Sequence, residues 1–448
     1  MAIKVNKRRL FAILSAIFLI GGTWLAIQYA QGKIRIGTDG IVQGTGLLSA
    51  TSDPKSAQIY INDRLVGATD ETIYLQPDTY EVKIEREGYH GWKKTLKIEP
   101  EFVSAANARL FPIATTLSPL TFTGTARLTP SPDGQKLAYY VASQSAQIKN
   151  GWYVLDLSGG LPFYSTKTPR QILVENPAFQ TENAHLIWSP DSTEIMFITS
   201  RKDVVVPLNA TSSIESLPDN SLLRGQTLAL WEEEMYLRER QYMAEFPEEV
   251  IAIATRSAKN VYFSPDKKML LYTATASAVL PDNLVPPLPA ASNQQQSREL
   301  SPNTVYVYDR HEDRNFALGE DTQPDAPSKF LLATDLDHPT AKTLVSSPSA
   351  FRKLQAATTS AQLAAMFNRY HSPLYTNTFQ WFPDSRHLMD ARDGAISIKE
   401  YDNTNEIVLY SGPFSNEFFY PWPDGSKIMV TASFNVNSPS NLYAIDLR

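Results

Sequence analysis

Five aspartates recur in one short phrase along the last three-quarters of the chain, and repeated carboxylates could serve as general acids or bases. Each phrase is an aromatic or polar residue, then Pro, then Asp, then a strand-like run. The five pairs are Pro132 and Asp133, Pro190 and Asp191, Pro265 and Asp266, Pro383 and Asp384, and Pro423 and Asp424. A catalytic carboxylate is needed once, whereas a turn residue is needed in every repeat. Because Pro presets φ in a turn and Asp tolerates the next position, we interpret these residues as structural repeat turns.

Other residues capable of chemistry are scattered or missing. The chain has no cysteine, which excludes disulfides, thiolate metal sites and catalytic thiols. Asp335 and Asp337 lie close in sequence but lack the Gly and Glu of a calcium loop. The six histidines form no His-x-x-x-His pair: His90, His185, His311, His338, His371 and His387. With no nucleophile elbow, phosphate loop or dinucleotide fingerprint, we predict no catalytic residue, metal ligand or cofactor, and expect no enzyme activity.

Aromatic side chains and net charge narrow the range of partners. Trp231, Trp381 and Trp422 could stack on sugar rings, although we favour positions in a packed core. The net charge of −6 and the pI near 5.7 argue against nucleic acid, which requires a basic face.

The segments after the Pro-Asp turns predict a sheet buried on both faces. Each turn is followed at a fixed offset by two adjacent apolar residues: Leu137 and Ala138, Ile195 and Met196, Leu270 and Leu271, Leu388 and Met389, and Ile428 and Met429. Adjacent side chains of a strand point to opposite faces, so both faces are expected to be covered. A later strand ending in Asp follows three of the turns, at Asp156, Asp309 and Asp446. Small antiparallel sheets repeated in this way indicate a β-propeller.

The repeated phrase resembles the TolB-like, WD-type propeller repeat, in which an aromatic residue and Ser-Pro-Asp-Gly precede an inner strand. Residues 188–191 and 263–266 match best, whereas Phe382 and Trp422 replace the Ser. The resemblance covers residues 113–448 and implies a mainly β fold with a propeller of five or six blades. It implies little about function, because propellers host many unrelated tasks. We also expect residues 120–124 to pair within the blade formed by residues 417–447, which would close the ring.

Three stretches interrupt the propeller pattern, at about residues 203–255, 279–301 and 318–375. The first carries Leu228, Trp231, Met235, Tyr242 and Phe246 at near-helical spacing, and Pro247 can open a second helix. A similar apolar stripe follows Pro348. Such stripes are usually buried, so we expect the helices to seal the propeller.

The N-terminal segment predicts a membrane anchor. Residues 10–30 contain no charge and give about 30 Å of helix, enough to cross a bilayer. The basic segment 1–9 precedes them, which places it in the cytoplasm and the bulk of the chain outside. A cleavable signal peptide is the alternative. Residues 31–45 are expected to be a linker.

Residues 46–112 predict a separate small β domain. Residues 58–61 alternate in polarity, Asn62 and Asp63 turn the chain, and Tyr80, Val82 and Ile84 share one strand face. The stretch resembles a PEGA domain, a small sandwich of exported and surface proteins of prokaryotes, through Ser52 to Pro54, Gly67 to Thr69 and Gly88 with Tyr89. It departs at Asp70 and Asp78, where Pro and Gly are usual. The resemblance implies a structural or adhesive module near a membrane or wall.

These patterns together predict a membrane-anchored, extracytoplasmic binding or scaffold protein. Its propeller would face an envelope protein or polysaccharide. The alternative is a propeller-based hydrolase or lyase that acts on envelope polysaccharide or peptide, since propeller enzymes often use scattered polar residues.

The predicted orientation, which depends on the change from basic residues up to Arg9 to uncharged residues from Leu10, can be tested with a protease. Protease added to intact cells should remove the mass beyond residue 30, because that part would lie outside the cytoplasm. The loss is read by immunoblotting, with a cytoplasmic protein as the control. Protection of the propeller from the protease would contradict the predicted orientation.

Overall fold

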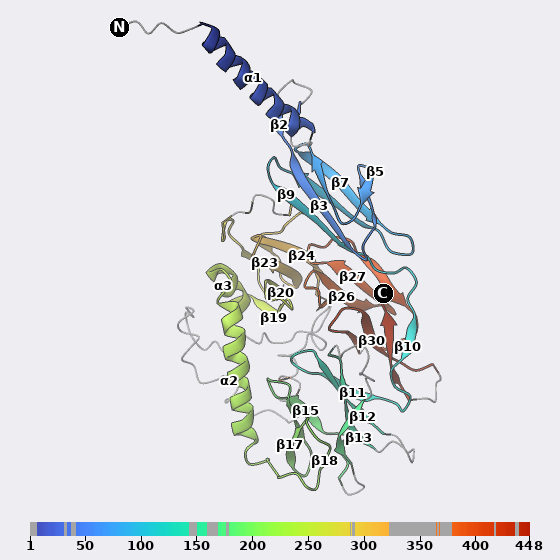
Figure 1. Cartoon of the computed structure of the whole chain (residues 1–448). Coiled ribbons are helices and arrows are strands. Elements are labelled where there is room, and N and C mark those ends of the chain that lie inside the picture. The colour runs from blue at the N-terminus through green and yellow to red at the C-terminus, as the bar shows by residue number, and fades with distance from the viewer. Residues whose placement is uncertain are drawn as a thin grey trace. The chain divides into compact units, whose positions relative to one another are not determined.

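The computed structural model describes residues 7–30, 34–36, 42–142, 150–158, 169–175, 179–286, 288, 292–321, 364, 367, 379–415, 418–434 and 439–448 (Figure 1). The chain divides into two compact units. Unit 1 is Met1–Phe111 with Pro287–Gln294, and unit 2 is Pro112–Pro286 with Gln295–Arg448.

Unit 1 begins with α1 (Lys7–Ala30), which covers the run without charge. Among the described residues, no helix combines the length and apolar character of a membrane span. The stretch expected to be a linker contains a short antiparallel pair, β1 (Ile34–Ile36) with β2 (Val42–Gly44).

The rest of unit 1 is a small β sandwich. Its strands are β3 (Gly46–Asp53), β4 (Gln58–Ile61), β5 (Arg64–Ala68), β6 (Glu71–Leu75), β7 (Asp78–Glu85), β8 (Trp92–Ile98) and β9 (Val103–Arg109). One sheet has the order β6-β3-β9, with β3 and β9 parallel, and the other has the order β5-β4-β7-β8. Alternate residues of both sheets are buried in one core, among them Leu48, Ile59, Val82 and Trp92. Asn62 and Asp63 have positive φ, which suits the predicted β4–β5 hairpin.

Unit 2 is a β-propeller whose described residues form five blade sheets and one additional two-stranded sheet. Blade 1 is β11 (Ala126–Pro130), β12 (Lys136–Val141), β13 (Gly151–Asp156) and β14 (Arg170–Val174), with β18 (Ser212–Ser213) paired to its edge. Blade 2 is β15 (His185–Trp188), β16 (Glu194–Ile198) and β17 (Asp203–Pro207). Blade 3 is β19 (Ala258–Phe263), β20 (Met269–Ala274), β23 (Thr304–Asp309) and β24 (Arg314–Glu320).

Blade 4 is β25 (Gln380–Trp381), β26 (His387–Arg392), β27 (Ala395–Glu400) and β28 (Ile407–Ser411). Blade 5 is β29 (Phe419–Pro421), β30 (Lys427–Ala432), β31 (Asn441–Asp446) and β10 (Leu117–Pro119). The second strand of each blade follows its Pro-Asp turn and is almost entirely buried, as the paired apolar residues predict. Side chains of neighbouring blades form common cores between blades 1 and 2, blades 3 and 4, and blades 5 and 1.

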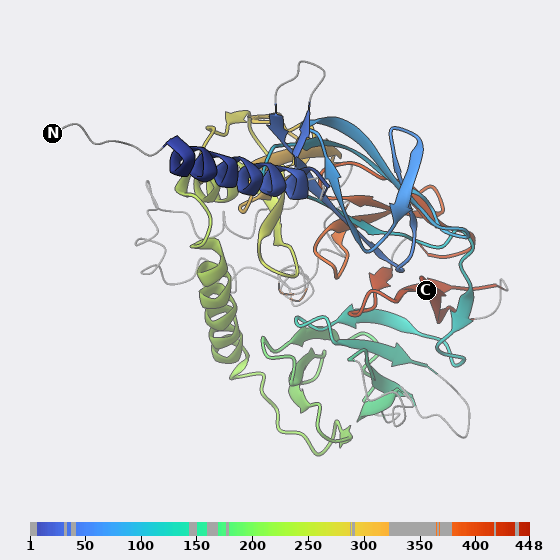
Figure 2. The same cartoon turned by 45° about the horizontal axis from the view of Figure 1, so that its top comes forward.

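The ring is closed by pairing its first strand with its last. β10 pairs antiparallel with β31, and it lies beside the C-terminal strands in Figures 1 and 2. The contact continues into the next residues, since Leu120 N donates to Leu442 O at 2.8 Å and Gly124 N donates to Asn441 Oδ1 at 2.9 Å. The predicted meeting of the chain's ends in the last blade is therefore confirmed, but the strand that pairs there is Leu117–Pro119, and residues 120–124 contact the blade through hydrogen bonds outside the strand.

Two helices lie between blades 2 and 3 in the chain. α2 (Arg224–Met243) packs Leu228 and Met235 against Ile187 and Met196 of blade 2. Its other end packs with blade 3, where Met243 lies in a core that also includes the Val250 side chain of α3 (Glu248–Arg256). The predicted helices and their sealing role are confirmed here.

The first insertion begins later than predicted, whereas the second lies within one residue of its predicted boundaries. The first begins after β18 rather than at residue 203, because the β-branched run of β17 pairs with β16. The second is framed by the pair β21 (Ala278–Val279) and β22 (Glu299–Leu300), and the third begins after β24. The stripe predicted after Pro348 lies outside the described residues, apart from Phe367, which is helical.

The closure of the ring by β10 can be tested through the stability of unit 2. Replacing residues 117–121 by a Gly-Ser linker of equal length should lower the melting temperature of unit 2 as a whole, because the ring would open at its seam. Differential scanning calorimetry should show one cooperative transition at lower temperature. Phe122→Ser is the control, since Phe122 is 80% exposed. An unchanged melt of the linker variant would contradict the role of the seam.

Candidate functional site

Each Pro-Asp turn is held by its own aspartate. In three blades a Ser hydroxyl donates to the carboxylate two residues on, as from Ser189 to Asp191 at 2.6 Å and from Ser264 to Asp266 at 2.7 Å, and likewise from Ser131 to Asp133. The carboxylate also accepts a backbone N–H, as from Thr193 N to Asp191 Oδ1 at 3.1 Å. Such local bonds are typical of turn residues.

Blades 4 and 5 have no Ser before the Pro-Asp pair. In each of them, a different side chain forms the hydrogen bond to the turn aspartate. His387 Nδ1 lies 2.8 Å from Asp384 Oδ2 in blade 4, and Ser426 Oγ donates to Asp424 Oδ1 at 2.6 Å in blade 5. Sequence reasoning missed both residues. A polar side chain two or three positions after the Asp, where Ser is absent before Pro, is the signal that could have found them.

Neighbouring turns are joined to one another. Asp133 N donates to Ser192 Oγ of the next blade at 3.2 Å, and Asp266 N donates to Ser385 Oγ at 2.9 Å. Ser192 and Ser385 have positive φ, the backbone conformation that the exit of the turn requires. The turns of blades 1 and 2, and those of blades 3 and 4, are therefore linked directly.

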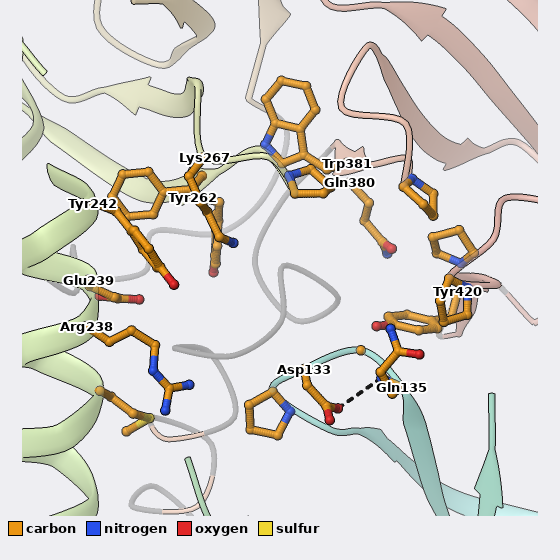
Figure 3. A pocket seen from close by; sticks show the side chains of 18 residues that line it. Asp133, Gln135, Arg238, Glu239, Tyr242, Tyr262, Lys267, Gln380, Trp381 and Tyr420 are labelled. Atoms are coloured by element: carbon orange, nitrogen blue, oxygen red, sulfur yellow. Dashed lines mark hydrogen bonds between the residues drawn. The ribbon is translucent and has the colours of Figure 1, made fainter. Parts of the chain in front are cut away.

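A pocket of about 470 Å³ lies where four of the five turns converge with α2 (Figure 3). The turns contribute Pro132 to Gln135, Pro265 with Lys267, Pro383 and Pro423, and α2 contributes Met235, Arg238, Glu239 and Tyr242. Strand residues complete the wall: Tyr262, Phe263, Gln380, Trp381, Tyr420 and Pro421. The structure thus brings turn residues of blades 1, 3, 4 and 5 to one site. The turn of blade 2 is touched from α2, because Arg238 donates to Pro190 O at 3.1 Å.

Several polar groups of the pocket are held by neighbours. Arg238 also donates to Glu234 Oε1 at 2.8 Å, and the Lys267 ammonium lies 5.4 Å from the centre of the Tyr242 ring. Asp133 accepts from Ser131, Gln135 and Lys136, so its carboxylate is held within its own turn. Burial, with a smaller contribution from Asp133, raises the pKa of Tyr420, which stays a neutral phenol. The pocket can therefore offer hydrogen bonds and aromatic faces.

The pocket lining is poor in titratable groups. Among its described residues it has two carboxylates, Asp133 and Glu239, and no histidine. In the described part of the chain, no group of three or more His, Asp or Glu side chains could hold a metal ion. Asp335, Asp337, His338 and His371 lie outside the described residues.

The three tryptophans have different surroundings. Trp422 is 3% exposed and packs with Leu137 and Met429, and Trp231 packs partly buried beside Ile187. Trp381 also belongs to a core and lines the pocket, and its indole N–H has no hydrogen-bond partner among the described residues. The preferred core interpretation holds for Trp422 and Trp381, and Trp381 also lines the pocket.

A comparison with protein-family models agrees with the resemblance to a PEGA domain. Residues 45–113 match the PEGA domain, and this segment of the chain is a PEGA domain. A comparison with curated protein sequences gives no match.

Solved structures similar to the chain include β-propeller proteins. A protein described as TolB from Agrobacterium tumefaciens matches at 10% identity and a TM-score of 0.21, over 90% of this chain and 86% of that one. TolB from Acinetobacter baumannii matches at 11% identity and a TM-score of 0.21, over 82% of this chain and 59% of that one. An oligogalacturonate lyase from Vibrio parahaemolyticus matches at 8% identity and a TM-score of 0.24, over 82% of this chain and 86% of that one. The TM-scores are low, so the description of unit 2 as a propeller depends on its own sheets and closure.

The turn aspartates can be tested at Asp191. Asp191→Ala should lower the free energy of unfolding by about 1 kcal/mol, because hydrogen bonds to Ser189 and Thr193 are lost. Chemical denaturation measures this change, and any ligand binding should fall only in step with folding. A variant that keeps its stability but loses binding would contradict the structural role.

The same variant should show a defined pH dependence. Burial raises the pKa of Asp191, but the hydrogen bonds from Ser189 and Thr193 outweigh this effect and hold the pKa below its ordinary value. A lowered folded-state pKa stabilises the protein above the unfolded pKa of about 3.9, and this contribution is lost as the pH falls through the folded pKa. The stability difference between the parent and Asp191→Ala should therefore be full above about pH 4 and shrink below it. A constant difference down to pH 2 would contradict this.

Proposed function

We propose that this protein is a binding protein of the cell envelope that holds a short extended segment of a partner protein in the pocket at the Pro-Asp turns. The observation that carries the proposal is the pocket itself. Its volume of about 470 Å³ falls in the range of ligand sites, which are mostly apolar with a few placed polar groups. Prolines, Tyr262, Phe263 and Trp381 supply the apolar surface here.

A binding role suits the rigidity of the site. The turn carboxylates are occupied by hydrogen bonds within their own turns, so the rim is ordered before a ligand arrives. A preformed site loses less conformational entropy on binding than a flexible one. The hydrolase or lyase alternative would need titratable groups that act on a substrate, and in the described pocket lining only Asp133 and Glu239 are carboxylates.

The proposed location follows from the sequence and the PEGA domain. Residues 10–30 are free of charge and follow a basic segment, which supports export with the bulk of the chain outside the cytoplasm. The PEGA domain at residues 45–113 supports a structural module close to a membrane or wall. Under this proposal, unit 1 holds the chain at the envelope and unit 2 binds the partner.

Binding can be tested with a displayed library of random 12-residue peptides selected on the full-length protein. Lys267→Glu should raise the Kd of a selected peptide at least tenfold, because the substitution reverses a charge on the pocket wall. Isothermal titration calorimetry measures the change.

Lys268→Glu is the matched control, since Lys268 lies on the same turn with its side chain 58% exposed and does not line the pocket. Failure to select any peptide, or equal affinity of both variants for the selected ones, would contradict the proposed function.

A further inference from the structure

Helix α2 carries apolar side chains on two opposite faces. Leu228 and Met235 are buried on the face that packs against blade 2. On the other face, Leu223, Leu230 and Leu237 are 53%, 59% and 49% exposed. These three leucines follow one another at intervals of seven residues, which is close to two turns of a helix, so they form one line along α2. This line is named the leucine stripe.

The leucine stripe points away from the propeller. Leu230 lies roughly 200° around the helix from Leu228, which packs on blade 2. Leu223 continues the line just before the helix begins, because Thr227 N donates to Leu223 O at 2.9 Å. In Figures 1 and 2, α2 lies at the outer edge of the described part of unit 2, where another helix can approach it.

The pattern of the leucine stripe is that of a helix which pairs with another helix. The outer face of a surface helix is normally polar, whereas apolar residues repeated every seven positions form the seam of a coiled coil. Glu233 and Glu234 are exposed on the two sides of the stripe and would lie at the margins of such a seam. These carboxylates therefore restrict the partner helix and its direction.

A parallel pair of α2 helices would bring these carboxylates together. The two-fold axis would then run along the helices and place Glu234 of one copy beside Glu233 of the other, on both margins. Opposed like charges across an interface are destabilising. An antiparallel pair with Leu230 facing Leu237 would place the two Glu234 side chains beside each other, with the same result.

An antiparallel pair centred on Leu230 buries the whole stripe. Leu230 then faces Leu230 of the second copy, and Leu223 faces Leu237 at both ends.

The same register gives both carboxylates a neutral neighbour. Glu234 lies beside Thr227 of the second copy, and Glu233 lies beside Gln226. The Thr hydroxyl and the Gln amide can each donate a hydrogen bond to a carboxylate. The charges on α2 thus fit a second copy of the same helix in this one orientation.

We propose that unit 2 associates with a second copy of this chain through the leucine stripe, as an antiparallel pair of α2 helices centred on Leu230. The interface comprises one helix of 20 residues, about 30 Å long, from each copy. Such a small interface gives a weak dimer. Met235 and Tyr242, which line the pocket, lie on other faces of α2, so the pairing leaves each pocket open.

Sedimentation velocity of the full-length protein over a range of concentrations tests the association. A mild detergent is included because α1 exposes apolar side chains such as Phe18. Leu230→Lys should raise the dimer Kd at least tenfold, because it places a charge at the centre of the seam. Leu222→Lys is the matched control and should change the Kd less than twofold, since Leu222 is fully exposed and lies off the stripe. Circular dichroism checks that both variants are folded.

Two results of this experiment would overturn the proposal. One is a protein that stays monomeric at every concentration. The other is a dimer that Leu230→Lys weakens no more than Leu222→Lys does, since its contact would then lie elsewhere.

Disulfide cross-linking tests the orientation, because the chain has no cysteine of its own. Under mild oxidation, Leu230→Cys should form a cross-linked dimer by itself. Leu223→Cys and Leu237→Cys should each stay monomeric alone and cross-link when the two variants are mixed. Leu222→Cys gives the background from random collisions, and non-reducing gels measure all four. Cross-linking of each stripe variant with itself, or none above the background, would overturn the antiparallel pair.

Discussion

The hydrogen bond between each turn aspartate and its own turn is the interaction on which unit 2 depends. It holds the sharp connection into the buried second strand of a blade, as at Asp191 and Asp266. The same turns are joined between blades through Ser192 and Ser385. One local interaction, repeated around the ring, thus fixes both the inner strands and the rim of the pocket. A site made from such a rim has little freedom to adapt, which favours selection by shape.

Helix α2 is the element that turns this rim into a pocket. Four turns contribute to the lining directly, and Arg238 on α2 reaches the carbonyl of Pro190 in the remaining turn. Tyr242, one helical turn further on, packs its ring under the Lys267 ammonium. The helix therefore connects the turns of blades 2 and 3, whereas Ser192 links the turns of blades 1 and 2 and Ser385 links those of blades 3 and 4. Its cation–π contact adds modest stabilisation, of the order of 1 kcal/mol at a partly exposed site.

Much of the fold could be predicted from local patterns, but the site could not. Adjacent apolar residues such as Leu270 and Leu271 indicate a strand covered on both sides, and both are fully buried. Pro247 marks the start of α3 because its φ suits the position before a helix. The pocket instead brings together Gln135, Tyr262 and Gln380, which are far apart in sequence. Their meeting depends on how the sheets are arranged around the ring, which no local pattern of residues reveals.

The pairing of β10 with β31 has a consequence for the order of folding. Ser118 Oγ donates to Ala444 O, a contact between residues 326 positions apart. Contacts of such long sequence separation form late, because the entropy of closing the loop must be overcome before they stabilise the chain. During synthesis, β10 emerges from the ribosome long before its partner strand exists. It must therefore remain an unpaired edge while four blades assemble. β10 has only three residues and ends in Pro119. Short edge strands that contain proline resist pairing with other chains, so β10 is protected from such pairing until β31 is made.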